Sequence, residues 1–255
     1  MIDYRLLEHI DQLEAAFALE VAIWGLEPRD GVPVSMLRAI QHGGGSVLGA
    51  YDDERLVGVT LAFPARLDER WILWSHMTGI DRDYQGQGVG FALKLQQREW
   101  ALGNGYDEIR WTFDPLQRGN ANFNLRRLGA TAERYHVNFY GVMADEINQA
   151  NVPSDRVEAI WRLCDPRVDA HISGMPAADD AAGSADLVVD MELPRVLDFN
   201  GQRHTYLVQI PRRLPRHESL LAWRLALRTV FTAAFDSGYC AVDFTPANAY
   251  LLRRR

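Results

Sequence analysis

The stretch IDRDYQGQGVG, residues 80–90, is followed directly by the helical segment FALKL. Strand-forming residues, 71–80, precede it, so the glycines lie in a turn that joins a strand to a helix. Such a turn points backbone N–H groups at one place, and the first helical turn adds unpaired N–H donors and the positive end of the helix dipole. We therefore expect an anion site here, suited to a phosphate or pyrophosphate, where glycine permits close approach and positive φ.

Three known phosphate-loop patterns compete for this stretch. The Walker pattern requires Lys-Ser/Thr after the last glycine, but Phe91 follows Gly90. The dinucleotide pattern G-x-G-x-x-G requires glycine at position 91 and would need Asp114 as its acidic ribose partner. The third pattern, Q/R-x-x-G-x-G/A, is satisfied by Gln85, Gly88 and Gly90. A bare match to it is common, so the elements around it matter.

Strands and helices alternate on both sides of this loop. The predicted strands of the first part are 2–6, 46–51, 55–64, 71–80, 106–113 and 132–143, and the predicted helices are 9–25, 33–42, 90–103 and 120–128. This order predicts a layered α/β or α+β fold with a mixed sheet. A stretch rich in Ala, Asp, Gly and Pro follows at 165–186, which is typical of a linker or long loop. Beyond it we expect strands at 187–193, 204–210 and 239–244 and a helix at 217–236.

Composition excludes several classes of protein. The 255 residues are 47% hydrophobic and 24% charged, which is ordinary for a globular chain and excludes a disordered or collagen-like one. No apolar run is long enough to span a bilayer and no secretory signal is visible, so a cytoplasmic location is expected. The net charge of −7, with only small arginine clusters, argues against nucleic-acid binding. The two cysteines lack metal-ligand spacing, so neither a metal site nor a disulfide framework is expected.

In this element order, the loop from Gln85 to Gly90 resembles that of the GNAT superfamily of acyl-CoA N-acyltransferases. The resemblance covers about residues 1–143. The segments SHMTGI, LKLQQREWAL, WTFDPLQRGNANFNLRRLGA and NFYG look like a branch whose members carry a C-terminal extension similar to 154–244. The family fold is a mixed, mostly antiparallel central sheet flanked by helices.

The resemblance also suggests a division of the chain. It implies a GNAT domain over 1–150, a linker or long loop over 151–186 and a smaller, partial GNAT-like repeat over 187–255. Residues 92–115 and 226–246 share a helix, a Gly-Tyr pair and a strand that ends in proline, which either a duplication or chance similarity would produce. The second segment lacks a Gly-rich loop before its helix.

The family resemblance implies that acetyl-CoA, or coenzyme A, is the bound cofactor. Thr78, Gly79 and Ile80 match the strand end that hydrogen-bonds pantetheine. The residues that match the pyrophosphate loop are Gln85, Gly86, Gln87, Gly88, Val89 and Gly90. Asn120 is a helix-capping candidate, and a contact with the CoA arm is its second interpretation.

The implied mechanism is direct transfer of the acyl group to the amine of a small molecule. Leu125 occupies the position where the family has a tyrosine as general acid, and leucine cannot donate a proton. Tyr84, Tyr135 and Tyr140 are candidate replacements, of which we favour Tyr140. A thiolate can also leave unassisted, because a thiol pKa is only about 8.5.

The base and the acceptor contacts have structural as well as catalytic interpretations. His76 lies mid-strand, where the family's strands splay, and is either the base or a hydrogen-bonded structural histidine. Asp114 is either a substrate anchor or base at the end of a strand, or the first residue of the turn before a proline. Glu20 and Glu27 either recognise a cationic acceptor or belong to a solvated helix face.

The sequence thus predicts an acyl-CoA-dependent, most simply acetyl-CoA-dependent, N-acyltransferase for a small-molecule amine. The alternative is a catalytically silent CoA or acyl-CoA sensor, or a scaffold on the same fold. We expect no nucleic-acid or membrane partner, and the sequence leaves a homodimer open.

Overall fold

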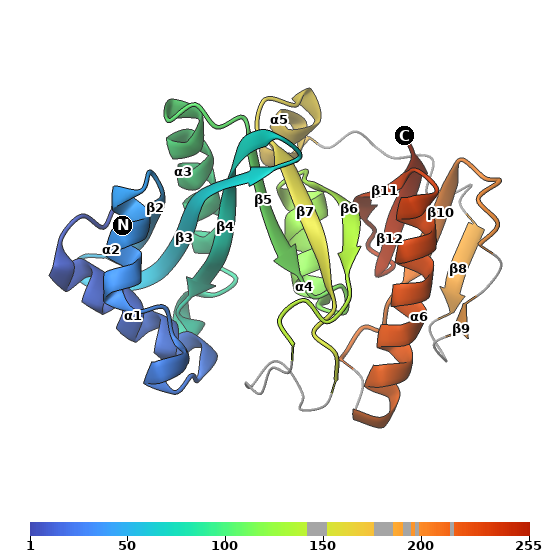
Figure 1. Ribbon diagram of the computed structural model, residues 1–255, viewed down its shortest axis with the longest axis horizontal. Helices are drawn as coiled ribbons and strands as arrows, with labels where there is room; N and C mark the ends of the chain where they lie inside the picture. The colour runs from blue at the N-terminus through green and yellow to red at the C-terminus, as the bar shows by residue number, and fades with distance from the viewer. Residues whose placement is uncertain (142–151, 176–185, 191–194, 197–198, 215–216) are drawn as a thin grey trace. The chain divides into compact units, whose positions relative to one another are not determined.

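The computed structural model describes residues 1–141, 152–175, 186–190, 195–196, 199–214 and 217–255 (Figure 1). The described chain divides into two compact units. The first holds Met1–Trp111, and the second holds the described residues from Thr112 to Arg255. Each unit is therefore considered by itself, and the predicted domain limits stay a prediction.

The first unit is built on a sheet of neighbouring antiparallel strands. These are β1 (Ile2–Leu6), β2 (Ser46–Asp52), β3 (Arg55–Leu67) and β4 (Arg70–Ile80), in that order. Strand β5 (Glu108–Phe113) runs parallel to β4 and pairs with it at Leu73–Ile109 and Trp74–Arg110. Both pairs lie in the first half of β4, so the second half of β4 extends beyond the pairing with β5.

Helices cover both faces of this sheet (Figure 1). Helices α1 (Ile10–Trp24) and α2 (Val34–His42) bury Leu13, Ala16 and Leu37 against Val59 and Leu61 of β3, with the short helix η1 (Pro28–Asp30) between them. Helix α3 (Val89–Gly103) buries Val89 and Leu93 in another cluster, with residues of β2 and β3. The helical spacing of these apolar residues explains why the segments fold as helices.

The strands of the second unit are also mostly antiparallel. Their order is β7 (Arg156–Arg162), β6 (Thr131–His136), β11 (Tyr239–Phe244), β12 (Ala249–Arg254), β10 (Thr205–Gln209), β8 (Asp186–Asp190) and β9 (Arg195–Val196). Only the pairing of β10 with β8 is parallel among these described strands. The helices are α4 (Arg118–Ala121), which continues as the π-helix η3 (Asn122–Arg127), α5 (Pro166–Ile172) and α6 (His217–Asp236). Both units thus have mixed α/β layers with a mostly antiparallel sheet, which confirms the predicted fold class.

Three local predictions need correction. The range 151–186, predicted as a linker, contains β7 and α5, while 176–185 lie outside the described residues. Strand β7 was not predicted because it buries Arg156 and Glu158 as well as apolar residues, so it has no polar face. Strand β6 ends at His136 rather than at 143, because a turn follows in which Asn138 has a φ of +49°. Strand β12 also lacked a prediction.

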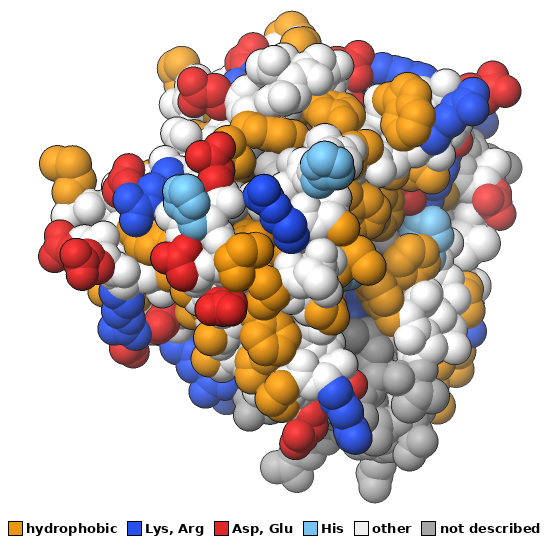
Figure 2. All heavy atoms as spheres, turned by 60° about the vertical axis from the view of Figure 1, so that its left-hand side comes forward, with side chains coloured by type: hydrophobic (Ala, Val, Ile, Leu, Met, Phe, Trp, Pro, Cys, Tyr) orange, Lys and Arg blue, Asp and Glu red, His pale blue; other side chains and the backbone are white. Residues whose placement is uncertain are grey.

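The surface of the described chain offers few special features. None of its helices combines the length and hydrophobicity needed to cross a bilayer. On the face drawn in Figure 2, acidic and basic side chains are scattered among one another. Within the described residues, no group of His, Cys, Asp or Glu side chains is arranged to hold a metal ion.

Candidate functional site

The glycine-rich loop of the first unit is held in shape by its own side chains. Helix η2 (Arg82–Tyr84) begins after Asp81, whose Oδ1 accepts a hydrogen bond from the Asp83 N–H at 3.0 Å. The Gln85 side-chain amide donates to the Ile80 carbonyl at 3.0 Å, and the Gln87 amide donates to the Asp83 carbonyl at 2.6 Å. The two glutamines therefore brace the loop rather than extend from it.

Gly86 and Gly88 both require glycine for their backbone conformation. Their φ angles are +76° and +87°, in the left-handed region that side chains disfavour. A Cβ built on either residue would have no protein atom within 4 Å, so the loop borders open space at both positions. The loop therefore leaves free space at these two glycines, and we call residues 85–90 the cradle.

Helix α3 begins at Val89, directly after this loop. Its N-cap is Gly88, which has no side chain to satisfy the first N–H groups, and the first turn carries no acidic residue. These donors and the positive end of the helix dipole favour an anion. A Cβ at Gly90 would lie 3.3 Å from Cγ1 of Ile80, so glycine lets the helix start close to the end of β4. The residues present fit a phosphate or pyrophosphate group.

The end of β4 leads into the cradle. Thr78 shares a 2.8 Å hydrogen bond with Thr60 of β3, and the Ile80 carbonyl accepts the Gln85 amide. A Cβ at Gly79 would meet the Trp24 ring at 2.5 Å, so the indole of α1 lies directly on the strand there. The residues predicted for cofactor binding from Thr78 to Gly90 therefore all belong to the first unit, whereas Asn120 belongs to the second.

A β-bulge interrupts β4 at His76. Met77 pairs with Leu61 and Ser75 pairs with Ala62, so His76 is an extra residue without a counterpart on β3. Such bulges redirect side chains and are frequent beside active sites. The His76 ring lies 6.2 Å from the Phe63 ring, and the residue is exposed. Although part of the residue is exposed, the surrounding protein partly desolvates the imidazole and lowers its pKa, so the neutral form, which can accept a proton, is favoured at neutral pH.

Three other predicted site residues, Asp114, Asn120 and Tyr140, belong to the second unit. Both carboxylate oxygens of Asp114 accept hydrogen bonds from Arg224 of α6, at 2.5 and 2.7 Å, and one also accepts the Leu116 N–H. This pairing anchors α6, and a role for Asp114 toward substrate stays a prediction. Asn120 is exposed within α4, whose N-cap is Gln117, so Asn120 does not cap the helix.

Leu125 is fully buried in the π-helix η3, so this position supplies no acid. Of the candidate replacements, Tyr84 donates to Asp52 at 2.8 Å and Tyr135 donates to Asp155 at 2.9 Å. A hydrogen bond to a carboxylate raises the pKa of Tyr84, and burial together with Asp155 raises that of Tyr135, which makes both poor proton donors. Tyr140 is exposed and its hydroxyl lies 3.0 Å from that of Thr112.

Two features escaped the sequence interpretation. Glu20 was expected on a solvated face or as a contact for a cation, but it is only 4% exposed and accepts the Val32 N–H. Lys94 is the single lysine of the chain and is 3% exposed in α3. Its unique occurrence was the one available signal, because a lysine in a helix is normally at the surface.

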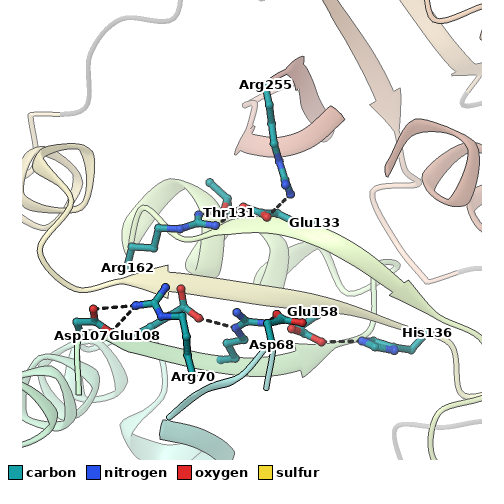
Figure 3. Close-up of polar contacts among 11 residues, drawn as sticks. Asp68, Arg70, Asp107, Glu108, Thr131, Glu133, His136, Glu158, Arg162 and Arg255 are labelled. Carbon is teal, nitrogen blue, oxygen red and sulfur yellow. Dashed lines mark hydrogen bonds and ion pairs between the residues drawn. The ribbon is translucent and has the colours of Figure 1, made fainter. Parts of the chain in front are cut away.

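The charged clusters drawn in Figure 3 are structural. In the first unit, the buried Arg110 pairs with Asp68 at 3.0 Å and with Glu108 at 2.6 Å. In the second unit, Glu133 accepts from Arg162 and Arg255. In each of these pairs a carboxylate and a guanidinium group within the same unit neutralise one another.

Comparison with known proteins gives matches that include the glycine-rich loop. Residues 13–130 match the model of the acetyltransferase (GNAT) family. None of the curated proteins matches the sequence. Among solved structures, a probable acetyltransferase from Staphylococcus epidermidis is similar with a TM-score of 0.52 and 15% identity, over 63% of this chain and 98% of that one.

Two further structures are similar at 15% identity and a TM-score of 0.50. The ribosomal-protein-S18-alanine N-acetyltransferase from Escherichia coli is covered to 94% by 64% of this chain. A chain of the NatC complex bound to Gag peptide and CoA is covered to 98% by 63% of this chain. At such identities the likeness concerns the fold alone.

Proposed function

Because residues 13–130 match the model of the acetyltransferase (GNAT) family, we propose that the protein transfers the acetyl group of acetyl-CoA to the amine of a small molecule. The observation that carries this proposal is the cradle formed by Gly86 and Gly88 at the start of α3, next to the bulge in β4. The net charge of −7 favours a cationic or neutral acceptor over an anionic one.

The residues of the loop would hold the donor. Backbone N–H groups of residues 86–90 would bind the pyrophosphate, and the end of β4 from Thr78 to Ile80 would lie along the pantetheine arm. Bound acetyl-CoA supplies the thioester from which the acetyl group is taken. The bulge at His76 redirects the backbone of β4, so a backbone N–H group there is a candidate for stabilising an oxyanion.

His76 would take the proton of the acceptor amine. The amine nitrogen forms a bond to the thioester carbonyl carbon, the carbon–sulfur bond breaks, and the electron pair leaves with the sulfur. His76 suits the role of base because its lowered pKa keeps the imidazole neutral. Tyr140 is our candidate for protonating the thiolate, since Tyr84 and Tyr135 are engaged with carboxylates. Asp114 carries no step here because Arg224 occupies both of its oxygens.

Calorimetric titration of coenzyme A tests the cradle. In Gly88→Glu, a carboxylate enters the proposed pyrophosphate site, and binding should weaken about 100-fold or more through charge and bulk together. Gly88→Ala separates backbone strain from charge. Gly103→Glu places the same side chain at the other end of α3, where a Cβ meets no atom within 4 Å, and should bind like the wild type. Equal binding by Gly88→Glu and the wild type would refute the site.

Thiol release from acetyl-CoA, measured with and without a panel of primary amines, tests the chemistry. Release that depends on an added amine supports the transferase. Tight CoA binding without such release would support the alternative, a catalytically silent acyl-CoA sensor. The buried Leu125, in the position of the family's tyrosine acid, is the observation that favours this alternative.

A further inference from the structure

A buried polar cluster lies on the α3 side of the β4 bulge. The Lys94 Nζ donates to Ser75 Oγ at 3.2 Å and to Gln97 Oε1 at 2.6 Å, and it lies 4.1 Å from the centre of the Trp111 ring. Lys94 and Ser75 are each 3% exposed and Gln97 is 0% exposed. These contacts join α3 to the strand residue directly before His76.

The same cluster also reaches the residue directly after His76. The Gln97 side-chain amide donates to Thr60 Oγ1 at 3.0 Å, and the Thr60 hydroxyl donates to the Met77 carbonyl at 3.0 Å. Since Thr60 has a single hydroxyl proton, the 2.8 Å contact with Thr78 is one in which Thr78 donates. We call Lys94, Ser75, Gln97, Thr60 and Met77 the Lys94 network.

The Lys94 network forms hydrogen bonds to the residues on both sides of His76 in the bulge. His76 lies between Ser75 and Met77 and has no partner in the register with β3. Polar groups buried without partners are costly, so a closed chain of hydrogen bonds fixes one arrangement of the groups that it joins. Lys94 itself is enclosed by Ser75, Gln97 and Trp111 and therefore acts through them rather than on a substrate.

We propose that Lys94 is a positioning residue, which holds the β4 bulge through Ser75 on one side and through Gln97 and Thr60 on the other and so sets the placement of His76. This inference rests on the proposed function. It predicts that loss of the Lys94 network slows acetyl transfer while binding of the donor persists, because the cradle at residues 85–90 is not part of the network.

The test begins with Lys94→Met, which keeps an unbranched side chain, one atom shorter, and removes the hydrogen-bond donors. We expect amine-dependent thiol release to fall about tenfold or more, because a small displacement of a reacting group is costly, while the Kd for coenzyme A stays within about twofold. Gln97→Met should cause a similar loss. The double variant should be no slower than either single one, because all three break the same chain. The matched control for Gln97→Met is Gln96→Met, which makes the same change in the neighbouring residue of α3, outside the network.

Nuclear magnetic resonance of the imidazole gives a readout independent of the acceptor. The His76 ring signals are assigned by their loss in His76→Gln. They should shift in Lys94→Met and in Thr60→Val, which cuts the far arm, and should stay in place in Gln96→Met. If Lys94→Met does not fold, Thr60→Val and Gln97→Met still decide the outcome.

The outcomes separate the two proposals. A wild-type protein that neither binds coenzyme A nor releases thiol refutes the proposed function, and the His76 signals then still report on the network. Full activity in Lys94→Met and Gln97→Met together with unshifted His76 signals overturns the inference. Reduced activity accompanied by an equal loss of CoA affinity also overturns it, because the effect would then be general unfolding of the site.

Discussion

Lys94 should make the stability of the protein depend on pH. Burial lowers the pKa of its ammonium group from 10.5 to about 7. Between these two values the unfolded chain keeps the proton that the folded protein has released, so the unfolded state binds more protons. The free energy of unfolding therefore rises as pH increases from about 7 to about 10.5, and this contribution is lost as pH falls toward 7.

The size of the effect follows from the shift. Where the unfolded chain holds one proton more than the folded protein, the free energy of unfolding rises by about 1.4 kcal/mol per pH unit. Near pH 7 the folded lysine is half protonated, so the slope there is roughly half as large. From pH 7 to pH 9 the contribution of Lys94 comes to about 2 kcal/mol. In Lys94→Met this titration is absent, whereas all other titrating groups are kept. The difference in unfolding free energy between the wild type and Lys94→Met should change by this amount.

Urea unfolding of both proteins at pH 7 and pH 9 measures this double difference. Gln96→Met should show the pH dependence of the wild type, because it leaves the lysine in place. The chain contains one lysine, so protein labelled with ¹³C in lysine alone gives the pKa directly from a single set of signals. Identical pH dependence in the wild type and Lys94→Met, or a lysine that titrates near pH 10.5, would refute the reasoning.

Two further predictions concern the second unit. Asp114→Asn leaves the buried Arg224 guanidinium without its counter-ion and should lower the free energy of unfolding by about 3–5 kcal/mol, measured by chemical denaturation; a loss below about 1 kcal/mol would show that solvent reaches Arg224. Gly129→Ala forces a Cβ to within 3.0 Å of His171 Cβ at a φ of +72° and should lower the melting temperature more than Gly141→Ala, which has a φ of +69° but no atom within 4 Å. Equal effects of the two alanines would mean that only backbone strain matters.

The loop and most elements around it were predictable from sequence. Glycine spacing marks a backbone that few other residues can adopt, and the periodicity of helices such as α1 and α3 reflects a single buried face. Helix α3 begins at Val89, one residue before the predicted start at residue 90. The GNAT resemblance extended this local signal to a whole fold, which the family model and the similar structures support.

The features that were missed depend on contacts between distant residues. Arg224 follows Asp114 by 110 residues, so their pairing leaves no local pattern. The bulge at His76 changes which side of the sheet later residues face, and simple alternation cannot indicate this. Strand β7 was missed because its buried Glu158 pairs with His136 at 2.8 Å, which makes an interior position look like a surface one.

The burial of the only lysine also bears on non-enzymatic acylation of this protein by a reactive acyl donor. Thioesters acylate neutral amines slowly without any catalyst, whereas guanidinium groups stay protonated and are poor nucleophiles. The chain has 27 Lys and Arg residues in total, and since Lys94 is the single lysine, the other 26 are arginines. Lys94 lies in the core, with its Nζ against Ser75, Gln97 and Trp111. The arginine side chains would keep their charge during long contact with acetyl-CoA, and the surface would resist the gradual chemical modification that lysine-rich proteins undergo.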